Sequence, residues 1–275
     1  MISLEVLSKD GTSRYGKNDY EEIQRPLIAQ GEDFVSLATQ DLTYEEGDLI
    51  EIKVDQPGYY WAKLDECLDT SLVYISDTTW RYHISLTKNA IDARPDNAFL
   101  SKRHYLSVRK ATKEQLQVHQ NLALNPLDQK EFHGAYPHAH ANVETRNDAT
   151  FFACNAIDGI AAPDMHGEYP YQSWGINRQE DAALTIDFGR PVLASGVGIV
   201  LRADFPHDSF WTAMTVTFSD GSKETLNLKK ANTIQTFAFA PRTIDSLTIN
   251  TLIKHEDDSP FPALTEFEVY GQHLI

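Results

Sequence analysis

The chain has 275 residues, of which 41% are hydrophobic, 23% charged and 11% aromatic. These proportions are typical of a globular protein of one or two domains and exclude a disordered or fibrous chain. The 40 Asp and Glu residues outnumber 24 Lys and Arg, giving a formal charge of -16, so binding to nucleic acid or to an anionic membrane surface is disfavoured.

Alternation of apolar and polar residues predicts short antiparallel strands along the first half. In the segment LIEIKV, Ile50, Ile52 and Val54 fall on one face and the charged residues on the other. The turn residues 55–58 follow, which predicts a hairpin. The other strands predicted in this half cover residues 60–64, 71–76, 80–86 and 99–108.

One short helix is predicted between the two halves. Thr112 and Gln115 have the spacing of a capping box, in which each side chain satisfies a free backbone N–H group of the first turn. The helix should end near residue 120. The next stretch contains Asn125-Pro126 and several charges, which is typical of a linker. We therefore expect a β-sandwich domain over residues 1–120, a linker over 121–135 and a second domain over 136–275.

The second half is again rich in predicted strands. Residues 219–222, SDGS, form a strong hairpin signal because Asp-Gly readily adopts the positive φ that such turns need. Short strands with turn signals between them and almost no helix predict an all-β protein of two jelly-roll-like β-sandwich domains. The strands predicted here cover 184–188, 192–203, 212–218, 223–228, 233–239, 244–251 and 265–270.

Five segments of this half occur in a recognisable order. They are NAIDG at 155–159, SWG at 173–175, LTIDFG at 184–189, FSDG at 218–221 and ALTEFEVYG at 263–271. Together they resemble a discoidin-like domain, also called a coagulation-factor type C or galactose-binding-like domain, over residues 136–271. The first half carries no comparable motif.

The resemblance implies an eight-stranded sandwich whose loops at one end hold sugars, lipids or protein surfaces. It also implies a structural calcium ion beneath those loops, with Asp158 and Glu266 at the ligand positions. The donor types agree, because Ca²⁺ prefers several oxygen ligands from carboxylates and loop carbonyls. The alternative is that Asp158 is a turn residue and Glu266 a solvated strand residue.

Residues 201–211, LRADFPHDSFW, hold the densest set of binding side chains. Arg202, His207 and Asp208 can form hydrogen bonds with sugar hydroxyls, and Phe205 or Trp211 can stack on a sugar face. Exposed aromatic residues in a surface loop indicate a partner. The alternative is that the aromatic rings fold into the core.

Two further segments supply candidates for the same site. Tyr169 and Tyr171 lie in an aromatic loop that also holds His166 and Trp174. The resemblance implies that Trp174 is a core residue. His138, Glu144 and Arg146 lie in the segment that opens the second domain, and they are predicted to contribute to sugar binding.

His138, His140 and Glu144 also have the H-x-H-x₃-E spacing of the first metal motif of cupins. Two imidazoles and a carboxylate suit Fe, Mn or Zn. A second cupin segment does not follow, and the other common catalytic motifs are absent from the sequence.

These features predict a non-catalytic carbohydrate-binding protein whose site lies in the second domain. Two alternatives remain: a metal-dependent enzyme acting on a sugar or sugar acid through His138, His140 and Glu144, or an adhesion module that binds a protein or a second copy of itself. The first residues lack the features of a secretory signal, and no apolar run reaches the ~20 residues of a membrane span. Cys67 and Cys154 are far apart, so we expect reduced thiols in a cytoplasmic protein.

Overall fold

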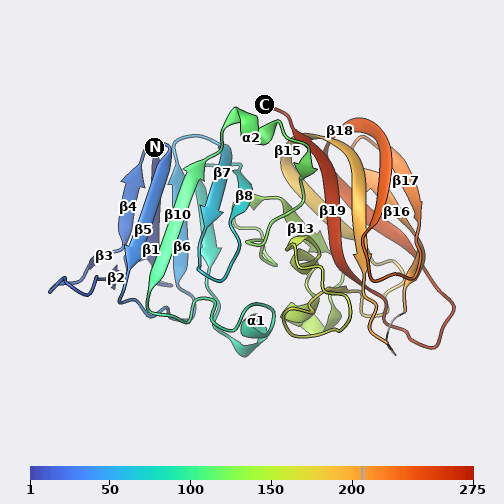
Figure 1. Cartoon of the computed structure of the whole chain (residues 1–275), viewed down its shortest axis with the longest axis horizontal. Coiled ribbons are helices and arrows are strands. Elements are labelled where there is room, and N and C mark those ends of the chain that lie inside the picture. The colour runs from blue at the N-terminus through green and yellow to red at the C-terminus, as the bar shows by residue number, and fades with distance from the viewer. Residues whose placement is uncertain (206, 208) are drawn as a thin grey trace. The chain divides into compact units, whose positions relative to one another are not determined.

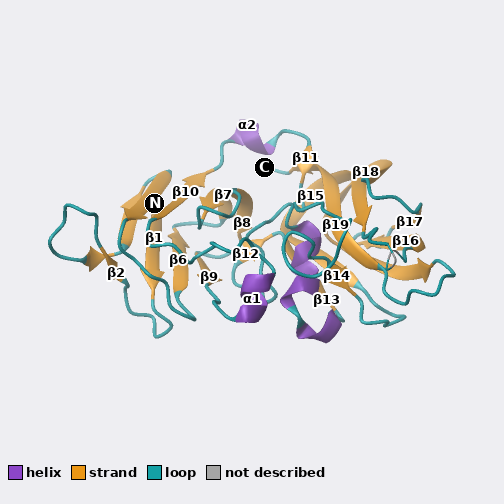
Figure 2. Cartoon of the chain, turned by 60° about the horizontal axis from the view of Figure 1, so that its bottom comes forward, coloured by secondary structure: helices purple, strands orange, loops and turns teal. Residues whose placement is uncertain are grey.

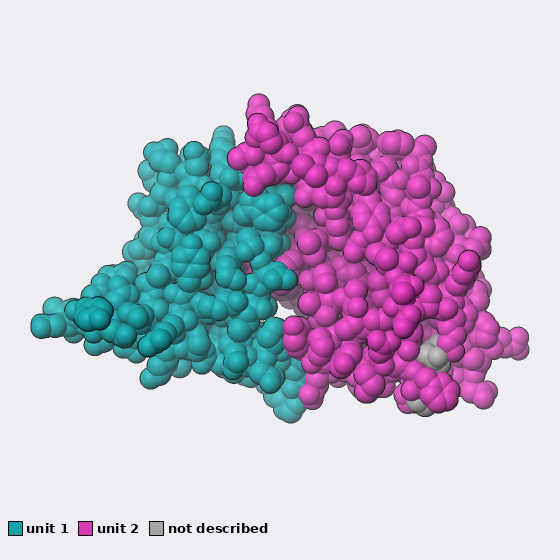
Figure 3. Space-filling model, viewed as in Figure 1, with its two compact units in different colours: residues 1–111, 133–135 teal, residues 112–132, 136–275 magenta. Residues whose placement is uncertain are grey.

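Strands form where the apolar and polar side chains alternate, and the chain is all-β (Figure 1, Figure 2). The structure is a computed structural model that describes residues 1–205, 207 and 209–275. It divides the chain into unit 1, residues 1–111 with 133–135, and unit 2, residues 112–132 with 136–275 (Figure 3). Within the described residues, no helix is long and apolar enough to cross a membrane.

Unit 1 is built from two larger antiparallel sheets and a small two-stranded sheet, β2-β3. One sheet has the order β4-β1-β6-β9, and the other has the order β12-β8-β7-β10-β5, with Ala135 of β12 in this unit. The elements are β1 (Ile2–Leu7), β2 (Tyr15–Gly16), β3 (Arg25–Pro26), β4 (Ile28–Gly31), β5 (Phe34–Thr39), β6 (Leu49–Val54), β7 (Gly58–Lys63), β8 (Ser71–Ile75), β9 (Thr79–His83), α1 (Lys88–Asp92), β10 (His104–Lys110) and β12 (Ala135–Tyr136).

The inward faces of the two sheets form the core of unit 1. Burial alternates along β5, where Val35 and Leu37 are buried and their neighbours are exposed. In β6 the predicted apolar face, Ile50, Ile52 and Val54, is buried. The predicted β-sandwich of this half is therefore confirmed. The predicted strand at 99–108 instead begins at His104, because residues 96–102 form turns and bends, with Phe99 at a positive φ of 63°.

Unit 2 is organised around one bent sheet with the order β11-β19-β15-β18-β16-β17, in which β13 also pairs with β15 and β14 with β19. The elements are α2 (Lys113–Leu116), β11 (Gln120–Asn121), β13 (His138–Ala141), three short 3-10 helices η1 (Thr145–Asn147), η2 (Ala149–Phe151) and η3 (Ala153–Ile157), β14 (Trp174–Gly175), β15 (Leu184–Leu201), β16 (Trp211–Phe218), β17 (Lys223–Asn227), β18 (Gln235–Lys254) and β19 (Ala263–His273).

Two local predictions are confirmed in unit 2. The capping box of α2 is formed, because Thr112 accepts from the Gln115 N–H and the Gln115 side chain accepts from the Thr112 N–H. The turn between β16 and β17 closes as predicted, with Gly221 at a φ of 83°. Cys67 and Cys154 are both free thiols.

Residues 121–132, predicted to be a linker, belong to the body of unit 2. Leu122 and Ala123 are buried in its hydrophobic core, and the Asn125 side chain donates to the carbonyl of Pro137 at 2.8 Å. Asn125-Pro126 is a turn signal, and the charges around it are typical of a linker. The two apolar residues before them, however, decide where the segment packs. The predicted helix at 112–120 also lies in unit 2 and is shorter than expected.

Candidate functional site

A pocket of about 180 Å³ opens in unit 2 where the loop after β15 meets the segment before β19. It is smaller than the ~300–1,000 Å³ typical of pockets for drug-sized ligands, so it suits one small molecule. Its lining combines polar and aromatic side chains: Thr145, Arg146, Phe151, His166, Gly175, Ile176, Asn177, Arg202, His207, Phe261, Pro262 and Ala263.

A buried ion pair anchors the polar side of the pocket. Arg202, immediately after β15, is 5% exposed and Asp204 is 4% exposed, and Arg202 Nε lies 2.8 Å from Asp204 Oδ1. Arg202 Nη2 also donates to the carbonyl of His207 at 3.2 Å and to that of Phe261. Arg202 is part of the pocket lining, so its guanidinium lies at the site.

His166 joins the same network. Its Nδ1 hydrogen-bonds to Asp204 Oδ2, the carboxylate oxygen that Arg202 does not contact. Because the carboxylate accepts, Nδ1 carries the hydrogen, and in the neutral ring Nε2 is an acceptor. The His207 ring lies edge-on to the His166 ring, with centroids 5.5 Å apart. Asp204 therefore orients a donor, Arg202, and an acceptor, His166, toward one space.

The pocket lining also contains aromatic side chains. Phe261, between two prolines in the segment before β19, is 41% exposed, and Arg178 lies over its ring at 4.4 Å. Phe151 is buried beneath Arg146, whose guanidinium carbon is 5.5 Å from the ring centroid. The exposed ring of Phe261 provides a surface on which the C–H face of a small ligand can pack.

The structure divides the residues predicted in the 201–211 loop. Arg202 and His207 line the pocket, whereas Phe205 is 88% exposed and lies outside the described lining. Trp211 is 1% exposed, with its ring centroid 6.3 Å from that of Trp174 in the core. Its predicted role as a stacking ring is therefore wrong, because the ring is almost completely buried in the core. Asp208 lies outside the described residues.

The candidates from the other two segments are also separated. Arg146 lines the pocket, but Tyr169 and Tyr171 are not part of its described lining. Tyr169 is partly exposed, and the Tyr171 backbone N–H donates to the carbonyl of Glu168 at 3.0 Å. They remain predicted contacts only for a ligand that extends beyond the pocket.

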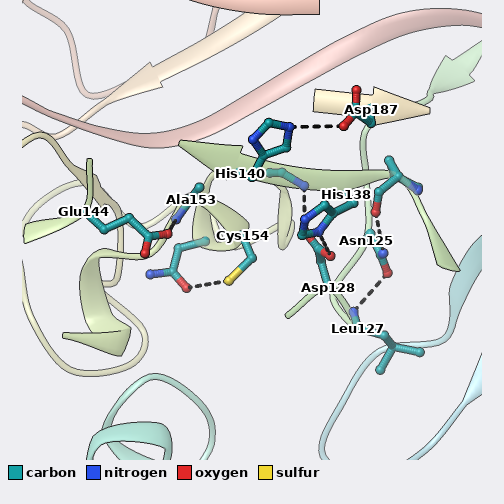
Figure 4. Close-up of polar contacts among 12 residues, drawn as sticks. Asn125, Leu127, Asp128, His138, His140, Glu144, Ala153, Cys154 and Asp187 are labelled. Carbon is teal, nitrogen blue, oxygen red and sulfur yellow. Dashed lines mark hydrogen bonds and ion pairs between the residues drawn. The ribbon is translucent and has the colours of Figure 1, made fainter. Parts of the chain in front are cut away.

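The proposed H-x-H-x₃-E metal site is not formed (Figure 4). His138 is buried against Asp128 at 2.9 Å, and His140 Nε2 lies 3.1 Å from Asp187. Glu144 points away from both and accepts from the Ala153 N–H at 2.8 Å. Within the described residues the three side chains do not bring ligand atoms close enough to share an ion. Glu144 and His138 are also absent from the described pocket lining.

The pKa of His138 reflects this structural role. Burial alone would lower it, but the hydrogen bond and the charge of Asp128 raise the pKa above its usual value. His138 and His140 both lie in β13, which pairs with β15. In this pairing His138 lies opposite Asp187 and His140 opposite Thr185. Strand geometry explains the spacing of the two histidines without a metal ion.

Asp158 and Glu266 lie close together, as their predicted calcium role requires. Asp158 accepts from Gln172 Nε2 at 2.7 Å and from the Ile160 N–H at 2.7 Å, and Glu266 accepts from the Gly159 N–H at 3.2 Å. Burial raises the pKa of Asp158 to about 7. Burial and then the charge of Asp158 raise the pKa of Glu266 well above its usual value.

Two buried oxygen atoms of this cluster have no hydrogen-bond donor among the described residues. They are Glu266 Oε1 and Gln172 Oε1. Unsatisfied buried oxygens are costly, and an oxygen-binding cation would compensate them. The residues present therefore fit a Ca²⁺ ion.

Sequence reasoning missed Phe261 and Phe151, and it considered His166 only as a loop residue. Phe261 stands in the segment SPFPA, an aromatic residue between two prolines just before the last strand. Prolines hold a loop in a fixed extended path, so this pattern was the signal available for an exposed ring. The pairing of His166 with Asp204 spans 38 residues and carries no local signal.

No protein-family model matches the chain, and no curated protein matches it. The similar solved structures are carbohydrate-binding modules of the family 32 and discoidin-like galactose-binding type, and they cover about half of this chain. A family 32 module from C. perfringens NanJ, solved with galactose, is 19% identical with a TM-score of 0.37 and covers 48% of this chain and 91% of its own.

Two more of the similar structures come from other bacteria. Chitosan-binding module 1 of a chitosanase/glucanase from Paenibacillus sp. IK-5 is 20% identical with a TM-score of 0.37, covering 56% of this chain and 100% of its own. A Streptococcus pneumoniae fucose-binding module is 14% identical with a TM-score of 0.41, covering 56% and 96%. At these values the similarities do not bear on the ligand of this chain.

Proposed function

We propose that the chain is a non-catalytic carbohydrate-binding protein whose pocket at Arg202 and His166 holds one sugar unit. The observation that supports this most is the buried Asp204, which orients Arg202 and His166 in a pocket whose lining also includes the exposed aromatic ring of Phe261. Polar groups and an aromatic ring together suit a sugar, because a sugar presents hydroxyl groups at its rim and C–H groups on its face.

The charge distribution of the lining favours binding over hydrolysis. The described lining contains no Asp or Glu side chain, whereas glycoside hydrolysis commonly uses a pair of carboxylates beside the bond that breaks. Asp204 is buried and engaged by both Arg202 and His166, so it is not placed to act as an acid or base.

The direct test is calorimetric titration of the full chain with galactose and fucose, the monosaccharides named for the similar structures, in wild type and in Phe261→Ala. We expect a dissociation constant in the micromolar to millimolar range for at least one sugar, weakened about tenfold by the variant, which corresponds to about 1.4 kcal/mol.

Phe34→Ala is the matched control. Phe34 is 43% exposed and also lies under an arginine, Arg109, at 4.8 Å, but it belongs to unit 1. It should leave the affinity unchanged. Absence of binding to a panel of mono- and oligosaccharides, or equal affinity in Phe261→Ala, would contradict the proposal.

We further propose that Asp158 and Glu266 bind a structural Ca²⁺ ion, with Gln172 Oε1 as a third oxygen. The ion would neutralise two buried carboxylates. Gln172 leads into β14 and Glu266 lies in β19, and these strands pair at Gly175 and Ala263, two residues of the pocket lining. Calcium would therefore stabilise the two strands that carry part of the pocket lining, and it would not contact the sugar.

Thermal unfolding in calcium and in chelator tests this second proposal. Saturation at about 100 times the dissociation constant stabilises by roughly 2.7 kcal/mol, which should raise the melting temperature of unit 2 by several degrees. Glu266→Gln should abolish the response, and Glu256→Gln, at an exposed position of the same unit, should keep it. An equal response in both variants would contradict the assignment.

A further inference from the structure

Three potential metal ligands converge in unit 1, outside the sugar site. Asp65 and Glu66 lie in the turn between β7 and β8, and His104 begins β10. One ligand atom from each residue lies within 4.8 Å of the other two. Asp65 and His104 are buried, and Glu66 is partly open to solvent.

Backbone groups hold each of these side chains in place. Asp65 accepts from the N–H groups of Cys67 and Phe99, both at 2.8 Å, and Glu66 Oε1 accepts from the Tyr105 N–H at 2.5 Å. The ring of Tyr44 packs on His104 with centroids 4.6 Å apart. Metal ligands are commonly oriented in this way by hydrogen bonds from their other atoms.

The hydrogen bonding of His104 decides which ring nitrogen can bind a cation. His104 Nε2 lies 3.1 Å from the carbonyl of Leu42, which can only accept, so Nε2 carries the hydrogen. In the neutral ring, Nδ1 therefore presents its lone pair to the carboxylates. His104 is 4% exposed, and among the residues described Nδ1 has no hydrogen-bond partner.

The separation of the ligand atoms favours a metal ion over a proton. Nδ1 lies 3.5 Å from Glu66 Oε2. A charge-assisted N–H···O hydrogen bond would close to about 2.7–2.9 Å. Two ligands at about 2.0–2.1 Å from one tetrahedral Zn²⁺ ion lie roughly 3.4 Å apart, close to the observed distance.

We propose that Asp65, Glu66 and His104 bind a divalent transition-metal ion such as Zn²⁺. One imidazole nitrogen and two carboxylate oxygens form a donor set that suits Zn²⁺ and its neighbours in the first transition row better than Ca²⁺, which takes oxygen ligands only. Three protein ligands with one side exposed leave the fourth position to water.

Calorimetric titration of untagged, chelator-treated full-length protein with Zn²⁺ tests the site. Wild type should bind one equivalent that Glu66→Gln weakens by more than about tenfold. The glutamine can still accept from the Tyr105 N–H, so the fold of the turn is kept. Asp69→Asn removes the same charge at an exposed position three residues away and should bind as wild type does.

Imidazole nitrogen resonances give a second measurement that needs no variant. Adding one equivalent of Zn²⁺ should shift the Nδ1 signal of His104 and leave its Nε2 hydrogen in place. Equal Zn²⁺ affinity in wild type and Glu66→Gln would overturn the proposal. So would a metal-free His104 that carries hydrogens on both nitrogens at pH 7 and does not respond to Zn²⁺.

Discussion

Trp211 and Phe205 lie six residues apart in the same loop region, yet only one of them is available to a partner. Trp211 begins β16 and packs in the core with Trp174, whereas Phe205 is almost fully exposed. An aromatic ring of this size removes a large apolar area from water when it is buried. The two side chains should therefore differ sharply in what they contribute to stability.

We expect Trp211→Ala to lower the free energy of unfolding by about 3–5 kcal/mol, because it leaves a cavity in the core of unit 2. Phe205→Ala should change it by less than about 0.5 kcal/mol, as is usual for exposed positions. Urea denaturation of both variants measures the difference. A small loss in Trp211→Ala would mean that the ring is not a core residue.

The burial of Trp211 could not be predicted from the sequence because the register of β16 changes beside it. Met214, Val216 and Phe218 alternate regularly and are buried. Trp211 is out of phase with them, and the pairing with β18 shifts between Trp211 and Ala213 and again before Thr215. A bulge restores the ring to the buried face, and bulges have no reliable local signature.

The partners of Arg202 could not be predicted from neighbouring residues either. The sequence identified Arg202 and His207 as polar groups of a surface loop, and both line the pocket. The lining also includes Phe261, 59 residues away from Arg202, whose guanidinium donates to the Phe261 carbonyl. Only the pairing of strands brings the two segments together, so the loop was predictable and the pocket was not.

At the scale of elements, the largest difference concerns β15. Two strands were predicted at 184–188 and 192–203, and the structure has one strand, Leu184–Leu201, with register shifts after Asp187 and after Ala194. Gly189, Arg190 and Pro191 separate the two predicted strands. Gly189, at a φ of 65°, instead bends the strand without ending it. The strands and their apolar faces were predictable, whereas the continuity across the bend was not.

The bend places two basic side chains together inside the protein. Arg190 and His273, from β15 and β19, are both buried, and Arg190 Nη2 lies 3.2 Å from His273 Nδ1. Burial, and then the charge of Arg190, lower the pKa of His273 from 6.5 to about 3. His273 is therefore neutral in the folded protein at every pH at which the protein is normally handled.

This pKa makes folding sensitive to acid. Below pH 6.5 the unfolded chain takes up a proton at His273 and the folded chain does not, so stability falls as the pH drops from 6.5 toward 3. The slope is about 1.4 kcal/mol for each pH unit within that window. Between pH 7 and pH 5, wild type should lose about 2 kcal/mol more than His273→Gln.

Urea denaturation at the two pH values measures this difference, with His119→Gln as a control at an exposed position of the same unit. The control should keep the pH dependence of wild type, because it leaves the buried Arg190 and His273 in place. If His273→Gln loses as much stability as wild type, the acid sensitivity arises elsewhere.

For the whole molecule, the boundary between the units decides which part of the chain folds alone. The core of unit 2 runs from Leu122 to Val269, so it includes the residues that resemble a linker in composition. All described residues of the pocket lining also belong to this unit. The alternation of apolar and polar residues predicts two β-rich halves. The assignment of 112–132, by contrast, depends on Leu122 and Ala123 packing in a core formed by strands far along the chain.

A fragment of residues 112–275 should therefore fold cooperatively and bind sugar with a dissociation constant within about threefold of the full chain, because it keeps its core and its pocket. Within this fragment, only residues 133–135 pack in unit 1 and lose their contacts. They would then form a short flexible loop, and the entropy cost of closing such a loop is small. Calorimetry should show one sharp transition.

A fragment beginning at 136, the predicted domain start, lacks Leu122, Ala123 and the Asn125 hydrogen bond, so it should melt at a lower temperature. Equal melting temperatures for the two fragments would show that residues 112–135 contribute nothing to unit 2.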